Sequence, residues 1–355
     1  MDKVLMKGNE AIGEAAVRAG CTNYFAYPIT PQSEVAEYLS RRLPEVGGVF
    51  LQGESEIAVS YMIFGAAAGG ARVFTTSSSP GISLMSEGIS YIAAAQCPAV
   101  FVNIMRGGPG LGGILPSQAD YLQATKGIGH GDMRLLVLAP ASVQEAVEMI
   151  MKAFPLAEKY RNPVMILGDG LIGQMMEPVT FPDNLKTEPS DKNSWATSGM
   201  STRGSDQRNL VKSLYLDPKK LNDNNLELKA KYDQMKREEI RFEAFHTTQG
   251  YKVLIVSYGT MSRVCRTAIE ILNEYGFSVG MIRPKTLFPF PEEAVALAAS
   301  KTGCEHVACI EMSMGQMVED VERAVKGACP VSWFGKCGGE VPTPEEVVAY
   351  VKSLV

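Results

Sequence analysis

The segment "LQGESEIAVSYMIFGAAAGGARVF", residues 51–74, decides how the first half of the chain folds. It contains the end of an apolar strand, a polar turn with two glutamates, an apolar helix rich in Gly and Ala, and the start of a second strand. A strand, a helix and a strand in that order predict a parallel sheet whose helices cover its faces.

The same alternation extends on both sides of this segment. Strands are expected at NYFAY (23–27), GVFL (48–51), RVFTT (72–76), AVFVNIM (99–105), RLLVLAP (134–140) and PVMILGD (163–169), and helices at 31–42, 55–70, 81–95, 117–127 and 142–159. A second series starts near residue 251, with helices near 262–275, 291–300, 316–327 and 344–353. We therefore predict two doubly wound α/β domains, 1–180 and 251–355.

Residues 181–250 separate the two series and are expected to form a linker. The segment begins with a Pro-rich polar stretch and continues with "LNDNNLELKAKYDQMKREEIRFEAF", residues 221–245, which predicts one charged amphipathic helix. Its apolar side should pack on a domain through Leu226, Tyr232, Met235, Ile240 and Phe245.

Composition excludes several classes of function. The 355-residue chain has a net charge of −5 and no basic stripe, so a nucleic-acid partner is not expected. Its seven cysteines include no C-x-x-C pair, which favours free thiols over disulfides or metal ligands. The N-terminus lacks a signal-peptide pattern, and the longest uncharged run, 88–105, contains Gln96, Pro98 and Asn103. A cytoplasmic protein without a membrane span is expected.

Glu54 and Glu56 are the first candidate site residues, because they stand where a strand gives way to an apolar helix. In the commoner arrangement such a carboxylate only caps the helix or interacts with its dipole. In the alternative, a glutamate against an apolar wall shares a proton with a heterocyclic ligand.

Thr30 is the second candidate, in "YPITP", residues 27–31. Pro31 suits the first position of a helix, so Thr30 is expected to be its N-cap. The functional alternative is that the hydroxyl and the helix N-terminus face an anion.

Arg106 is the third candidate, since it ends an otherwise apolar strand. A guanidinium there needs an anionic partner, either a carboxylate side chain or a substrate carboxylate. The following "GPGLGG" (108–113) matches G-x-G-x-x-G, but Pro109 and Pro116 argue against a dinucleotide turn. "GDG" (168–170) is expected to be a loop at a strand end, and no role is assigned to His130 in its loop.

Six motifs in order identify a resemblance to the α subunit of 2-oxoacid:ferredoxin oxidoreductases over nearly the whole chain. They are YPITPQSE (27–34), ESE (54–56), TSSSPGISLMSE (76–87), MRGGPG (105–110), IRPKTLFPFP (282–291) and EMSMGQMVEDV (311–321). The resemblance implies a thiamine diphosphate pyrimidine-binding-type domain followed by a transketolase C-terminal-like domain.

The resemblance also implies roles for individual residues. Glu56 would be the catalytic glutamate that contacts N1′ of the cofactor's aminopyrimidine, with Glu54 as the weaker competitor. Thr30 and Arg106 would bind the substrate carboxylate. Pro28 and Ile29, from the same motif as Thr30, would contact the cofactor.

The implied reaction converts a 2-oxoacid and coenzyme A to acyl-CoA and carbon dioxide with reduction of ferredoxin. This chain lacks a magnesium–diphosphate motif and a cluster-binding cysteine set, so Mg²⁺ and [4Fe-4S] clusters are expected on β, γ and ferredoxin-like δ subunits. With no basic residue between Arg106 and Lys126, the loop resembles the 2-oxoisovalerate type more than the 2-oxoglutarate type. The alternatives are a non-oxidative thiamine-dependent decarboxylase or ligase subunit, and a non-catalytic binding module.

Overall fold

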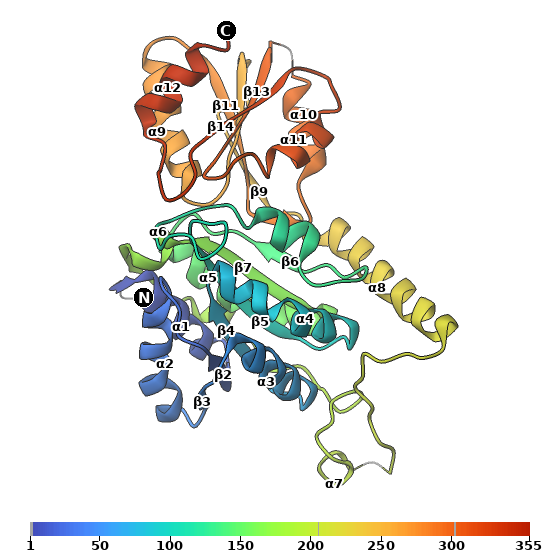
Figure 1. The fold of residues 1–355 in the computed structure, drawn as a ribbon. Helices are drawn as coiled ribbons and strands as arrows, with labels where there is room; N and C mark the ends of the chain where they lie inside the picture. Colours follow the sequence, from blue (N-terminus) through green and yellow to red (C-terminus); the bar gives the residue numbers. More distant parts are fainter. Residues whose placement is uncertain (1–2, 205, 302) are drawn as a thin grey trace.

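The structure is a computed structural model that describes residues 3–204, 206–301 and 303–355, and two large sheets organise it (Figure 1). The first sheet has seven strands. In order across the sheet they are β12 (Thr286–Phe288), β6 (Leu136–Leu138), β7 (Pro163–Asp169), β5 (Ala99–Met105), β4 (Val73–Ser77), β2 (Asn23–Ala26) and β3 (Val49–Gln52). All neighbouring pairs are parallel except β12 with β6.

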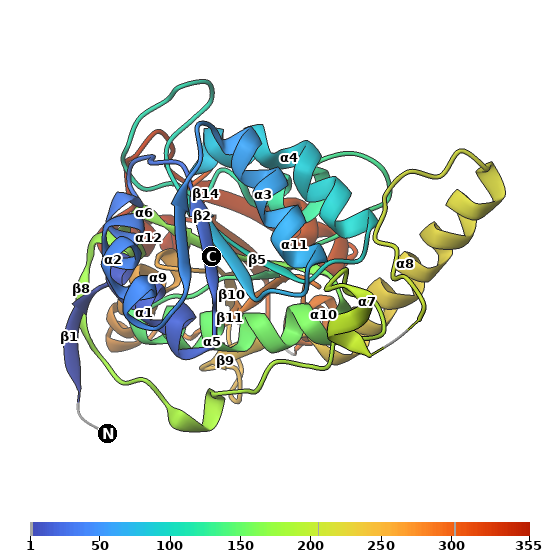
Figure 2. The ribbon, with the colours of Figure 1, turned by 90° about the horizontal axis from the view of Figure 1, so that it is seen from below.

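Helices cover both faces of this sheet, as Figure 2 shows in a view from below. One face carries α1 (Gly8–Arg18), α2 (Ser33–Glu45) and α5 (Val143–Tyr160), and the other carries α3 (Glu56–Ala68) and α4 (Ser79–Ala94). Alternate side chains of β5 enter the two cores, with Val100 and Val102 on the first face and Phe101 on the second. The predicted doubly wound α/β fold is confirmed.

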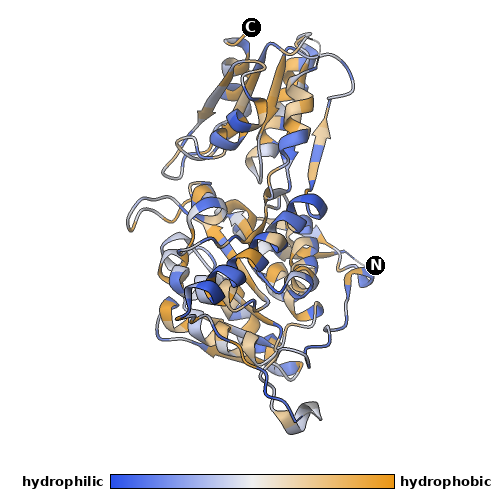
Figure 3. Ribbon diagram, turned by 90° about the vertical axis from the view of Figure 1, so that its right-hand side faces the viewer, coloured by the Kyte–Doolittle hydropathy of each residue, from blue (hydrophilic) through white to orange (hydrophobic). Residues whose placement is uncertain are grey.

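The second sheet has five strands and lies above the first in Figure 1. Its order is β14 (Val331–Gly335), β13 (His306–Glu311), β10 (Val253–Val256), β11 (Val279–Pro284) and β9 (Phe242–Phe245). The helices are α9 (Met261–Glu274), α10 (Glu292–Ala299), α11 (Val318–Val325) and α12 (Pro344–Lys352), each close to its predicted place. The strands of this sheet carry mainly hydrophobic residues (Figure 3).

Two predicted helices are wrong in part. The charged helix α8 (Pro218–Glu238) ends before residues 242–245, which form the antiparallel edge strand β9 because β11 offers them a hydrogen-bonded partner. Tyr232 and Met235 are buried as expected, whereas Leu226 is exposed. In the segment 117–127 only residues 121–127 are helical, and they include the π-helical turn η1 (Gln123–Gly127), because the residues before them bond to the second domain.

Shorter elements complete the described chain. They are β1 (Val4–Lys7), paired with β8 (Met176–Val179), and the helical segments α6 (Gly170–Gln174), η2 (Asp183–Leu185) and α7 (Met200–Arg203). None of the helices in the described ranges is both long enough and apolar enough to cross a membrane.

The two domains share one hydrophobic core and a buried polar seam. Gln118 donates from its backbone amide to the carbonyl of Met312 at 2.8 Å, and its side-chain oxygen accepts from the Met312 amide at 3.0 Å. Arg283, also buried, donates to both carboxylate oxygens of Glu145 at 2.6 and 2.7 Å. Strand β12, which follows β11, joins the seven-stranded sheet. The second domain is therefore attached to the first by buried hydrogen bonds, an ion pair and a shared strand.

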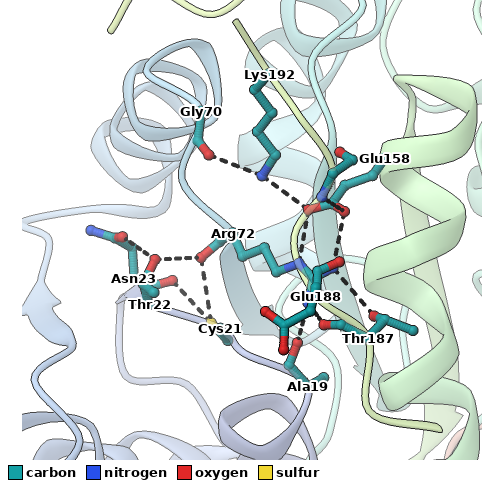
Figure 4. Close-up of polar contacts among 11 residues, drawn as sticks. Ala19, Cys21, Thr22, Asn23, Gly70, Arg72, Glu158, Thr187, Glu188 and Lys192 are labelled. Carbon is teal, nitrogen blue, oxygen red and sulfur yellow. Dashed lines mark hydrogen bonds and ion pairs between the residues drawn. The ribbon is translucent and has the colours of Figure 1, made fainter. Parts of the chain in front are cut away.

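A buried ionic clasp holds the linker against the first domain (Figure 4). Arg72 forms a bidentate pair with Glu158, with N···O distances of 2.8 and 2.9 Å, and also donates to the carbonyl of Thr187. Lys192 bonds Glu158 at 2.9 Å and the carbonyl of Gly70 at 2.9 Å. Residues 187–192 thus pack on the domain, as expected for the linker.

Candidate active site

Four strand ends bring the predicted site residues to one edge of the seven-stranded sheet. Thr30 follows β2, Glu56 follows β3 and Arg106 follows β5, while helix α4 begins directly after β4. Because β5, β4, β2 and β3 are neighbouring parallel strands, their carboxyl ends lie on the same edge. This is the edge where doubly wound folds bind ligands.

Glu56 is the first residue of α3 and is buried, with 6% of its surface exposed. Ser55, and not a glutamate, caps the helix by accepting a hydrogen bond from the amide of Ala58. Glu54 is exposed and accepts from the Ser55 hydroxyl. Of the two candidate glutamates, Glu56 alone is directed inward, against Gly81 in the first turn of α4.

The carboxylate of Glu56 has room in its position only because residue 81 is a glycine and carries no side chain. A Cβ at Gly81 would lie 2.8 Å from Oε1 of Glu56 and 2.1 Å from the hydroxyl of Ser77. Both distances are far shorter than van der Waals contact. No hydrogen bond to the Glu56 carboxylate comes from any residue in the described ranges.

Arg106 is buried, with 7% of its surface exposed, and its guanidinium bonds only to carbonyl oxygens. Nη1 donates to Thr30 at 2.9 Å and Nη2 to Leu111 at 3.2 Å, while Nε is buried without a partner. Within the described residues no carboxylate pairs with it, so the first of the two predicted partners is not found. The positive charge of Arg106 is therefore not neutralised by any carboxylate of the described residues.

The structure corrects the expected role of Thr30 as a helix cap. Helix α2 begins at Ser33, and its N-cap position is held by Gln32, so Thr30 and Pro31 precede the helix. The reason is that the carbonyl of Pro31 accepts from Asn9 at 2.8 Å, which holds the turn outside the helix. Thr30 contacts Arg106 through its backbone carbonyl, and its side chain is exposed.

The two remaining predicted residues, Pro28 and Ile29, lie in the same turn. Pro28 is exposed and Ile29 is half-buried. The carbonyl of Ile29 accepts from the amide of Gln32 at 3.1 Å. The turn therefore presents its first residues to the solvent beside the Arg106 contact.

Sequence reasoning missed a polar network behind Arg106. The hydroxyl of Ser79 donates to Asp120 at 2.6 Å and accepts from the amide of Arg106 at 3.0 Å. Asn103 donates to the same Asp120 oxygen at 2.9 Å. Burial raises the pKa of Asp120, although the bonds from Ser79 and Asn103 act in the opposite direction. Asn103 in an apolar strand was the signal that such a network exists.

Unpartnered polar atoms cluster at the same edge. The hydroxyls of Ser77 and Ser78 are buried without a hydrogen-bond partner, like Nε of Arg106. Buried polar groups are nearly always satisfied, so several orphans in one place indicate a ligand site. Ser78 occupies the N-cap of α4, yet its side chain forms no capping bond.

The two motifs set aside in the sequence form contacts within the chain. The glycine loop after β5 folds back on itself, with the amide of Gly113 donating to the carbonyl of Gly107 at 2.8 Å. Asp169 caps the short helix α6 by accepting from Leu171 and Ile172, and it also accepts from Thr260 at 2.5 Å. Burial raises the pKa of Asp169 despite these bonds.

Several apolar side chains near the site are exposed on the surface. Ile57 and Tyr61 lie on the exposed side of α3, where a Cβ on Gly65 would meet no atom within 4 Å. Leu111 and Ile114, in the loop after Arg106, are 84% and 60% exposed. Such a patch beside unsatisfied polar groups is typical of a surface that another chain covers.

Comparison with known proteins agrees with this arrangement. The family model "Pyruvate flavodoxin/ferredoxin oxidoreductase, thiamine diP-bdg" matches residues 14–244, and "Pyruvate:ferredoxin oxidoreductase core domain II" matches residues 252–347. The chain is 45% identical to ketoisovalerate oxidoreductase subunit VorB of Methanothermobacter thermautotrophicus, over 99% of this chain and 97% of the relative. It is 38% identical to 2-oxoglutarate synthase subunit KorA of Archaeoglobus fulgidus, over 99% of each.

Solved structures show the same likeness. The 2-oxoglutarate:ferredoxin oxidoreductase from Magnetococcus marinus with 2-oxoglutarate, coenzyme A and succinyl-CoA bound matches with a TM-score of 0.86 and 27% identity. That match covers 99% of this chain and 65% of the other chain. A split-gene transketolase matches with a TM-score of 0.62 and 16% identity, which shows a shared fold alone.

Proposed function

Because the chain belongs to the pyruvate flavodoxin/ferredoxin oxidoreductase family, we propose that it is the α subunit of a thiamine diphosphate-dependent 2-oxoacid:ferredoxin oxidoreductase. The complete enzyme oxidatively decarboxylates a 2-oxoacid to acyl-CoA and carbon dioxide and passes two electrons to ferredoxin. The observation that carries this assignment is the buried Arg106 guanidinium, which bonds only to carbonyls and has no carboxylate partner among the described residues.

The residues at the strand ends fit the aminopyrimidine of the cofactor. Glu56 presents a buried carboxylate without a partner in the described chain, and Gly81 leaves open the space beside it. When bound, thiamine diphosphate supplies the carbanion that attacks the 2-oxo carbon. In this proposal Glu56 exchanges a proton with N1′ of the pyrimidine, and burial of its side chain keeps water from competing for that proton.

Arg106 and the turn before α2 would orient the substrate. Arg106 provides the positive charge for the carboxylate of the 2-oxoacid, and the carbonyls of Thr30 and Leu111 hold its guanidinium plane in place. Ser79 fixes the Arg106 backbone from behind. Thr30 adds a hydroxyl at the rim of this pocket, and Pro28 and Ile29 line the cofactor side.

The surroundings of Arg106 favour 2-oxoisovalerate over 2-oxoglutarate. Lys126, the next basic residue after Arg106, is ion-paired with Asp320 at 2.5 Å and so is not free to bind a second carboxylate. Leu111 and Ile114 of the intervening loop are apolar and suit a branched aliphatic side chain. The 45% identity to a ketoisovalerate oxidoreductase subunit supports the same choice.

Partner subunits are required for turnover. We propose that a β subunit covers the exposed side of α3 and supplies the Mg²⁺–diphosphate site, which places the cofactor between the two chains. The exposed apolar residues Ile57 and Tyr61 and the open surface at Gly65 support this position. The [4Fe-4S] clusters, and the contacts to coenzyme A and ferredoxin, are assigned to the β, γ and ferredoxin-like δ subunits.

Purification of the native complex tests the assignment. We expect iron and thiamine to co-purify with this chain, and viologen to be reduced when coenzyme A and 2-oxoisovalerate are both present, with a lower kcat/KM for 2-oxoglutarate. A protein that purifies without iron-containing partners contradicts the proposal. Turnover that continues without an electron acceptor indicates a non-oxidative decarboxylase instead.

A further inference from the structure

Ser77 and Glu56 face each other across the space left by Gly81. Ser77 is the last residue of β4 and is fully buried, and its hydroxyl has no hydrogen-bond partner. Glu56 opens α3 and is also buried. The position that a Gly81 Cβ would occupy lies 2.1 Å from the Ser77 hydroxyl and 2.8 Å from Oε1 of Glu56. The two groups are therefore neighbours.

We propose that Ser77 is a positioning residue for Glu56. With the cofactor bound, its hydroxyl donates a hydrogen bond to one carboxylate oxygen of Glu56, and the other oxygen is directed at N1′ of the pyrimidine. Gly81 is required because a side chain there would occupy the space between the two groups. This inference rests on the proposed function, since it assumes that Glu56 contacts the cofactor.

The chemistry of the two groups is complementary. An ionised carboxylate only accepts hydrogen bonds, whereas a serine hydroxyl can donate one. A buried hydroxyl without a partner is destabilising, so the Ser77 hydroxyl gains stability when it finds an acceptor. No hydrogen bond joins Ser77 and Glu56 in the described structure, so the proposed bond requires a change of rotamer in one of the two side chains.

Strand β4 provides a matched control. Thr75 lies two residues before Ser77, so its side chain is on the same face of the strand, and its hydroxyl is equally buried and unpartnered. The three atoms nearest to the position of a Gly81 Cβ belong to Ser77 and Glu56, and none belongs to Thr75. Thr75→Val therefore removes a comparable buried hydroxyl from the same strand, one that is not among the atoms nearest the Gly81 position.

Cofactor binding by the purified complex, depleted of cofactor and supplied with Mg²⁺, tests the proposal. Two ligands are compared: thiamine diphosphate, and an analogue in which carbon replaces N1′ of the pyrimidine. Ser77→Ala should weaken thiamine diphosphate binding about 5- to 20-fold and leave the analogue's affinity unchanged, because the analogue cannot use Glu56. Gly81→Ala should have at least the same selective effect, and Thr75→Val should have none.

If Ser77→Ala loses the same amount of affinity for both ligands, Ser77 has a merely structural role and the proposal is overturned. An unchanged affinity of Ser77→Ala for thiamine diphosphate would also overturn the proposal. Glu56→Gln separates this inference from the proposed function. If that variant loses the preference for thiamine diphosphate while Ser77→Ala keeps it, only the role of Ser77 is wrong. If Glu56→Gln keeps the preference, the cofactor-facing role of Glu56 is wrong as well.

Discussion

At the scale of single residues, Arg106 is a buried cation that no carboxylate of residues 3–204, 206–301 or 303–355 pairs with. Arg106 is buried, fixed by carbonyls from two loops and supported by Ser79. A cation held in this way is stabilised fully only when a carboxylate enters. This arrangement explains why an otherwise apolar strand ends in arginine.

Replacement of Arg106 should weaken the use of the 2-oxoacid. For Arg106→Ala in the assembled enzyme we expect kcat/KM to fall by a factor that corresponds to about 2–5 kcal/mol, the loss typical of a desolvated charge pair. The effect should appear mainly in KM, because in the proposed role the charge binds the substrate carboxylate. Steady-state kinetics with 2-oxoisovalerate measures it.

Arg134 offers the control for this substitution. Its guanidinium also donates only to carbonyls, those of Lys126 and Met133, but it lies outside the site. Arg134→Ala should leave kcat/KM within about twofold of the wild type. An Arg106→Ala enzyme with wild-type kcat/KM would refute the binding role.

Individual side chains were only partly predictable from the sequence. The inward direction of Glu56 follows from a strand–helix junction, and the structure places it there. The cap at Thr30 was wrong because bonds from Asn9 to the turn, distant in sequence, override the local preference. The link from Ser79 to Asp120 spans 41 residues, and no local pattern predicts it.

At the scale of elements, the Arg72 clasp joins α5 to the linker. Burial alone would raise the pKa of Glu158, but hydrogen bonds from Arg72 and Lys192 outweigh it and lower the pKa to about 2. A carboxyl group whose pKa is lower in the folded state stabilises the fold above its unfolded pKa, near 4.5. That stabilisation is lost as the pH falls from about 4.5 towards 2.

Acid should therefore loosen the clasp. We expect the free energy of unfolding to fall by about 2–3 kcal/mol for this group between pH 5 and pH 2. Glu158→Gln should show a smaller fall over the same range, since glutamine does not titrate. Urea unfolding at a series of pH values measures both slopes.

Glu37→Gln is the control for this titration, because Glu37 is exposed and forms no ion pair within the described ranges. Its pH slope should equal that of the wild type. If Glu158→Gln and the wild type have identical slopes, the clasp does not contribute to stability as described.

Most elements were predictable, because hydrophobic periodicity marks them locally. The helices of the second series begin and end within a few residues of their predicted places. The exceptions depend on distant partners: residues 242–245 became a strand beside β11, and β12 joined the sheet of the other domain. A three- or four-residue edge strand carries too little periodicity to be distinguished from a helix end or a loop.

At the scale of the whole molecule, the two C-terminal motifs of the resemblance fasten the domains together. Arg283 of the first motif binds Glu145, and Asp320 of the second accepts from Tyr121 and Lys126. The sequence identified these motifs only as family markers. In the folded chain both motifs link the two domains, because the residues that Arg283 and Asp320 bind come from the other half of the chain.

Glu56 and Arg106 lie at the carboxyl ends of parallel strands in the same sheet, and the exposed apolar residues Ile57 and Tyr61 of α3 follow Glu56. The boundaries predicted for the domains and the positions of the partner subunits stay predictions. The central claim, however, concerns one carboxylate: that Glu56 carries the proton transfer with the cofactor.

Turnover of the reassembled complex with Glu56→Gln tests that claim most directly. Glutamine keeps the size of the side chain but cannot exchange the proton, so we expect kcat for 2-oxoisovalerate-dependent viologen reduction to fall about 10²- to 10⁴-fold. Subunit assembly, measured by size-exclusion chromatography, should be unchanged. A Glu56→Gln complex that assembles and turns over at the wild-type rate would contradict the account.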